Sequence, residues 1–187
     1  SGYDIRSMLR VLFNSDAFKN ARFSRIKSPI ETVVGTLRLI GDWTAPKPGF
    51  EFIFDEMKFM GQEPLNPPSV EGWHEGIEWV DSGALVERVN FAAKELSDVS
   101  SPGVRSIIHR LEAGADQGVL DPADLADGCL DLLGPIEVSE ETRSVLVEYA
   151  ARQGDLDLSG HQPGDEAEKR VGNMLRLVAA TREYQLA

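Results

Sequence analysis

The chain has 187 residues, 42% of them hydrophobic, which is enough for one domain, or two small ones, with a buried core. Acidic side chains outnumber basic ones by 31 to 19, and the formal net charge of −12 argues against nucleic acid or an anionic membrane as the main partner. Apolar runs stay well short of the roughly 20 residues of a membrane-spanning helix, so we expect no membrane insertion. The single cysteine, Cys129, excludes an internal disulfide.

The first part of the chain predicts an amphipathic helix. Apolar residues recur at helical spacing over residues 3–20. A basic run, Lys19, Arg22, Arg25 and Lys27, comes at its end and beyond it. This run fits two interpretations: an anion-binding site, or a cationic helix end that pairs with acidic side chains of the same chain.

A second helix is predicted to start sharply at Ser28. Ser28 is a good N-cap, Pro29 suits the first helical position, and Glu31 can close a capping box. The helix should run to Ile40, because Gly41 follows as a typical C-terminal residue. We expect the Glu31 carboxylate to bond the Ser28 amide or an upstream basic group such as Lys27 or Arg22.

The remaining helical patterns predict an all-α fold. We expect an irregular, multi-helix globular domain. Further helices are expected over about 50–60, 81–96, 102–115, 122–133, 139–153 and 165–180. We find no convincing β alternation. The polar stretch 97–101 divides a helical core (1–96) from a smaller helical subdomain (97–187) packed on it as one globular unit. Cys129 lies on an apolar helix face, which favours a small core residue over a nucleophile.

A long connection over residues 59–80, the proline–tryptophan loop, interrupts the helices and is expected to be non-helical. Pro67 and Pro68 lack amide donors and should run extended, and Trp73 and Trp79 lie further along. The turns are assigned to Gly61, Gly72 and Gly76. A connection this long inside a compact domain is typically functional or packed by its own side chains.

Two interpretations of this loop stay open. In the first, Trp73 and Trp79 with Pro67 and Pro68 form an exposed platform that stacks on sugar rings or on an extended, proline-rich peptide. In the second, the tryptophans plug the loop onto the helices, and their N–H groups meet loop carbonyls. Polar side chains would then tie the loop to a helix. The candidates for that role are Gln62, Arg88 and Asn90.

An acidic loop before the last helix is the best metal candidate. It fits the D-x-D-x-S-G-x₅-E spacing of a calcium loop, in which oxygen atoms are the ligands. The ligand positions are Asp155, Asp157, Ser159, the His161 carbonyl and Glu166. Pro163 and the absence of an evident partner loop argue for the alternative, a solvated acidic loop. Beyond this calcium, we expect no cofactor.

The sequence shows no motif of a familiar active site. His74, His109 and His161 lie far apart without a second His or Cys at zinc spacing. There is no nucleophile elbow, P-loop or dinucleotide fingerprint. We therefore expect a non-catalytic binding or scaffold role. The alternative is part of a hydrolase that cleaves a polymer with paired carboxylates, whose separation a sequence does not show.

Several ordered segments also carry a family resemblance. They are 12–18, 34–38, 60–62, 67–73, 90–92 and 180–185. These segments resemble a bacterial family known only as domain of unknown function number eighteen hundred. The resemblance covers nearly the whole chain and implies the C-terminal portion of a longer protein, exported or in the cell envelope. Together with the platform interpretation of the loop, this location suggests a glycan or protein partner there. It supplies no activity, cofactor or catalytic residue, and His74-Glu75 stands where family members often have Pro-Gly.

Overall fold

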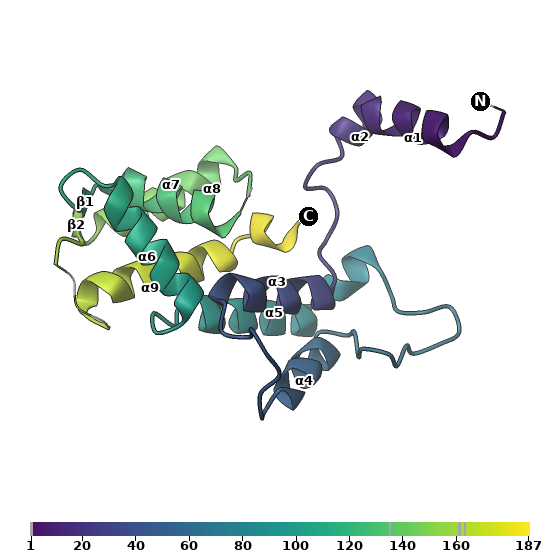
Figure 1. Cartoon of the computed structure of the whole chain (residues 1–187), viewed down its shortest axis with the longest axis horizontal. Helices are drawn as coiled ribbons and strands as arrows, with labels where there is room; N and C mark the ends of the chain where they lie inside the picture. Colours follow the sequence, from purple (N-terminus) through teal and green to yellow (C-terminus); the bar gives the residue numbers. More distant parts are fainter. Residues whose placement is uncertain (1, 135, 161, 163) are drawn as a thin grey trace.

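The structure is a computed structural model that describes residues 2–134, 136–160, 162 and 164–187. Within these ranges the chain is all-α, as predicted, apart from one two-stranded sheet (Figure 1). The helices are α1 (Ile5–Asn14), α2 (Asp16–Lys19), α3 (Pro29–Ile40), α4 (Glu51–Phe59), α5 (Ser82–Leu96), α6 (Pro102–Gly114), α7 (Pro122–Leu133), α8 (Glu140–Ala151) and α9 (Glu166–Ala179). The 3-10 helices are η1 (Gly76–Val80) and η2 (Glu183–Gln185), and the strands are β1 (Val119–Leu120) and β2 (Leu156–Asp157). Among the described residues, no helix is long and apolar enough to span a membrane.

The start of α3 confirms the predicted capping box. The Ser28 hydroxyl accepts the Glu31 N–H, and the Glu31 carboxylate accepts the Ser28 N–H at 2.7 Å. The basic group that joins them is Arg25 and not Lys27 or Arg22, with two bonds of 2.6 and 2.7 Å to the Glu31 carboxylate. Gly41 ends the helix in the left-handed region at φ 66°, where glycine meets no Cβ penalty.

One buried cluster runs through both halves of the chain. Helix α5 packs against α3 and α4 on one side and against α9 on the other, and α9 in turn packs against α7 (Figure 1). Phe91 from α5 and Val171 from α9 belong to this cluster. Cys129 is fully buried within it, and burial raises the pKa of its thiol to about 12. Cys129 is therefore a core residue, as predicted.

A two-stranded sheet joins two helix–loop–helix units, α6–β1–α7 and α8–β2–α9. Val119 pairs with Asp157 and Leu120 with Leu156 in antiparallel register. Gly118 lies against the second loop, where a Cβ would come within 3.0 Å of the Ser159 backbone. The pairing is a correction to the sequence analysis, which found neither strands nor a partner for the acidic loop. Two residues are too few to show alternation.

The N-terminal helix pattern is broken in two. Ser15 takes an extended conformation and its hydroxyl accepts the Phe18 N–H, so Ser15 ends α1 and caps α2. Neither helix buries a residue. Figure 1 shows both helices standing off the body formed by the other helices.

Candidate functional site

The proline–tryptophan loop leaves the body after α4 and returns at α5 (Figure 1). Gly61, Gly72 and Gly76 all have positive φ, between 64° and 104°, so they make the turns assigned to them. Gly76–Val80 forms the 3-10 helix η1, which corrects the expectation that the whole loop is non-helical. This part follows the last proline, so its amides are free to form turns.

Gln62 fixes the beginning of the loop. Its side chain is buried, and its amide oxygen accepts the Ile30 N–H at 3.0 Å. The first amides of a helix have no partner within the helix, so Gln62 satisfies one of those of α3. Gln62 therefore ties the loop to a helix, as the second interpretation proposed.

Trp73 and Trp79 have different environments. The half-buried Trp73 donates its indole N–H to the Glu63 carbonyl at 3.1 Å, the kind of contact expected of a packed loop. Trp79 is only 8% exposed and its Nε1 has no hydrogen-bond partner among the described residues, so the expected carbonyl is missing there. Trp79 plugs the loop onto the body, whereas Trp73 stays in reach of a ligand.

A surface groove of about 450 Å³ gathers the loop's candidate residues beside Trp73. Its lining consists of Lys58, Gly61, Glu63, Asn66, Pro67, Pro68, Trp73 and His74. Trp73, Pro67 and Pro68 thus come together as the first interpretation expected. The groove combines one indole, two proline rings and four polar side chains.

The polar side of the groove is organised around Glu63. Asn66 donates to one oxygen of the Glu63 carboxylate at 2.9 Å, and Lys58 donates to the other at 3.3 Å. These bonds, first that from Asn66, lower the pKa of Glu63. His74 completes this side, with its Nδ1 3.0 Å from Glu78. Three polar residues of the groove were not predicted from the sequence, namely Lys58, Glu63 and Asn66, although their positions flanking the prolines were a usable signal.

Arg88 and Asn90 do not belong to the groove. Arg88 is fully buried and connects two distant segments: its Nε donates to the Gln185 side chain at 3.0 Å and its Nη2 to the Lys27 carbonyl at 2.7 Å. Burial lowers the pKa of this guanidinium to about 10. Asn90 is exposed on α5. Arg88 and Asn90 therefore do not tie the loop to a helix as expected. Gln62 alone of the three does so within the described part of the chain.

The acidic loop places its candidate calcium ligands as follows. The Asp157 carboxylate accepts the N–H and the hydroxyl of Ser159 at 2.8 and 2.5 Å, and these bonds lower the pKa of Asp157. Asp157 also lies in β2, and Glu166 is the first residue of α9. His161 lies outside the described residues. In the described part of the chain no three His, Cys, Asp or Glu side chains gather as a metal site, and calcium stays a prediction.

Comparison with known proteins identifies the family. The chain belongs to the DUF1800 family, whose model, described as a protein of unknown function, matches residues 1–186. Neither a curated protein nor a solved structure gives a match. The family description names no activity.

Proposed function

We propose that this chain is a non-catalytic binding module and that the groove beside Trp73 binds a glycan. The observation that carries the proposal is the composition of that groove, which sets a half-buried indole and two exposed prolines next to a carboxylate, an amide and an imidazole. An indole face stacks on the apolar side of a sugar ring. The polar groups on the other side offer hydrogen bonds to its hydroxyls.

The groove favours a glycan over an extended peptide for two reasons. A proline-rich peptide docks on a groove lined by several aromatic rings, and here Trp73 is the one ring besides His74. The Trp73 N–H is also occupied by the Glu63 carbonyl, so it is not free to bond a peptide carbonyl. By contrast, Glu63 and Asn66 are already held together, which preorganises an acceptor and a donor for hydroxyl groups.

We further propose that the protein is exported and meets its glycan partner in the cell envelope. The family resemblance supports this placement, and a polar groove suited to sugar hydroxyls agrees with it. Fractionation of the native cells, with an antibody against residues 1–187, tests the placement separately from the binding. Recovery of the protein only in the cytoplasm would contradict it.

The binding proposal is tested by a glycan array followed by calorimetry on the strongest hit. Trp73→Ala should weaken that hit by about tenfold or more, because stacking is worth about 1 kcal/mol or more per ring. Trp43→Ala is the matched control, since Trp43 is also half-buried but packs against Phe52 outside the groove. It should leave the affinity unchanged.

Three outcomes would change the proposal. An array without hits, or hits that Trp73→Ala leaves intact, would overturn it. Trp73-dependent binding to an extended peptide but to no glycan would move the site to the other ligand class. Release of shortened products from a bound glycan would favour the hydrolase alternative, because a binding module leaves its ligand uncut.

A further inference from the structure

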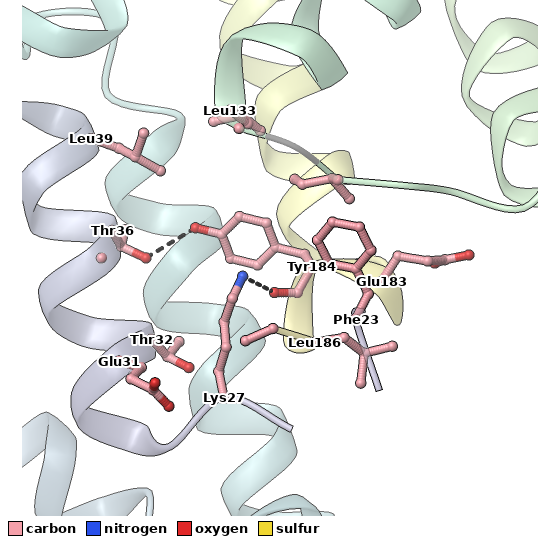
Figure 2. A pocket seen from close by; sticks show the side chains of 14 residues that line it. Phe23, Lys27, Glu31, Thr32, Thr36, Leu39, Leu133, Glu183, Tyr184 and Leu186 are labelled. Atoms are coloured by element: carbon pink, nitrogen blue, oxygen red, sulfur yellow. Dashed lines mark hydrogen bonds between the residues drawn. The ribbon is translucent and has the colours of Figure 1, made fainter. Parts of the chain in front are cut away.

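A second concave site lies at the junction of α3 with the segment before it and the last residues of the chain (Figure 2). It is a cavity of about 340 Å³, distinct from the groove. Its apolar lining includes Phe23, Leu39, Leu133, Ile136, Tyr184 and Leu186. A cavity of this size is at the lower end of the range for small-molecule sites.

Lys27 supplies the cation of this cavity. Its side chain is half-buried, and Figure 2 shows the amine lying beside Tyr184. The amine donates to the Tyr184 carbonyl at 2.7 Å and lies 4.6 Å from the centre of the Tyr184 ring. An ammonium group has three donors, so two remain for a ligand.

Both arginines of the basic run are paired with carboxylates, whereas Lys19 is exposed on α2 outside the cavity. Arg22 lies 3.4 Å from Glu137, and Arg25 lies 2.6 Å from Glu31. These two follow the interpretation in which the run pairs with acids of the same chain. Lys27 lies within 4.0 Å of no carboxylate of the described residues, and Arg25 already neutralises Glu31, the nearest acid on α3.

Besides the Arg25–Glu31 pair, the charged groups to consider around Lys27 are Arg88 and Glu183, whose Oε2 is buried without a partner among the described residues. Buried Arg88 from α5 lies behind it, and burial together with the charge of Arg88 lowers the pKa of Lys27. Glu183 from η2 accepts the Ser139 N–H and the Thr142 hydroxyl, and Figure 2 shows its carboxylate turned away from the amine. An anion beside Lys27 therefore gains more than it would at an exposed lysine.

Thr32 provides a second, independent sign of a ligand. It is only 2% exposed, it lines the same cavity, and its hydroxyl has no hydrogen-bond partner in the described part of the chain. A buried hydroxyl without a partner costs stability, and a polar atom in the cavity would relieve that cost.

We propose that this cavity binds a small carboxylate with an apolar tail, the carboxylate on the Lys27 amine and within reach of the Thr32 hydroxyl, the tail against Phe23 and Leu133. A single amine with one nearby hydroxyl suits a carboxylate better than a phosphate, which is typically held by several donors. The apolar lining of the cavity is the reason for proposing an apolar tail on the ligand. Because the carboxylate and the amine must both be charged, the affinity is highest above the pKa of the carboxylic acid and falls as the pH rises through the pKa of Lys27.

The experiment measures octanoate binding to the full chain by calorimetry, with octanol and acetate as probes for the tail and the charge alone. Octanoate should bind at millimolar concentration or tighter, and both controls more weakly. Lys27→Met keeps the apolar stem and removes the charge, and should weaken octanoate by about tenfold. Lys19→Met, at an exposed lysine of α2, should change nothing.

Two results would overturn the proposal. One is equal affinity for octanoate and octanol, which would make the cavity an apolar crevice without a cation site. The other is no saturable octanoate binding up to about 10 mM. If Lys27→Met does not fold, a wild-type series from about pH 6 to pH 10 decides instead: octanoate affinity must fall across it while octanol affinity stays constant.

Discussion

Two polar regions of the molecule, the groove beside Trp73 and the buried junction that Arg88 forms with Lys27 and Gln185, differ in burial and in how far apart their residues lie in the sequence. In the groove, Glu63 bonds Asn66 and Lys58, all within one short stretch of chain and at the surface. At the junction, Arg88 is fully buried and its partners lie 61 and 97 positions away. Buried polar groups need partners or they destabilise the fold, whereas exposed ones are free for a ligand. The junction therefore holds the structure together, and the groove is the better place for binding.

Arg88→Ala should give the largest effect. It leaves the Lys27 carbonyl and the Gln185 amide oxygen without a buried donor, and we expect the free energy of unfolding to fall by about 3 kcal/mol. Urea unfolding followed by circular dichroism measures it. Asn90→Ala, an exposed site on the same helix, is the control and should stay within about 0.5 kcal/mol. Equal losses for the two variants would contradict the stabilising role assigned to the buried bonds of Arg88.

Gln62→Ala should come next. The variant leaves the partly buried Ile30 N–H without its acceptor and frees the start of the proline–tryptophan loop, and the expected loss is about 1.5 kcal/mol. Hydrogen exchange should show faster exchange at Ile30 and across residues 61–75, with little change at α7. A loss spread evenly over all helices would mean that the loop is not held separately by Gln62.

Glu31 should make a smaller, pH-dependent contribution. Hydrogen bonds from Arg25, with help from the Ser28 N–H, lower the pKa of Glu31 from 4.5 to about 2. A depressed pKa stabilises the fold above the unfolded value, and this stability is lost as the pH falls from about 4.5 towards 2. Because the pair is partly exposed, Glu31→Gln should cost below about 1 kcal/mol at pH 7. Stability curves of the two proteins should converge in acid; parallel curves would refute the assignment.

Calcium should have the smallest effect. The Asp157 carboxylate is engaged by Ser159, and no group of acids converges among the described residues, so melting temperatures in about 1 mM calcium and in chelator should agree within about 1 °C. A larger difference that Glu166→Gln removes would establish the calcium loop and contradict this expectation.

Most of what could be predicted about the fold came from residues that lie close together in the sequence. Caps such as Ser28 and Ser139 act on amides within three residues, so helix starts could be predicted from neighbouring side chains. The groove was partly foreseen for the same reason, since Pro67, Pro68 and Trp73 are close in sequence. The role of Arg88 could not be predicted from the sequence, because its partner Gln185 is 97 positions away and only packing brings the two together. The β1–β2 pairing was missed because strands of two residues show no pattern.

The central claim, that the groove beside Trp73 binds a glycan, is tested most directly by nitrogen-15 NMR of the indole N–H groups. The chain has three tryptophans, each giving one such signal, and substitution of each in turn assigns them. On titration with the strongest array hit, the Trp73 signal should shift and saturate, while the signals of buried Trp79 and of Trp43, which does not line the groove, stay nearly fixed. A saturating shift of Trp43 or Trp79 with Trp73 unchanged, or no shift at all, would contradict the claim.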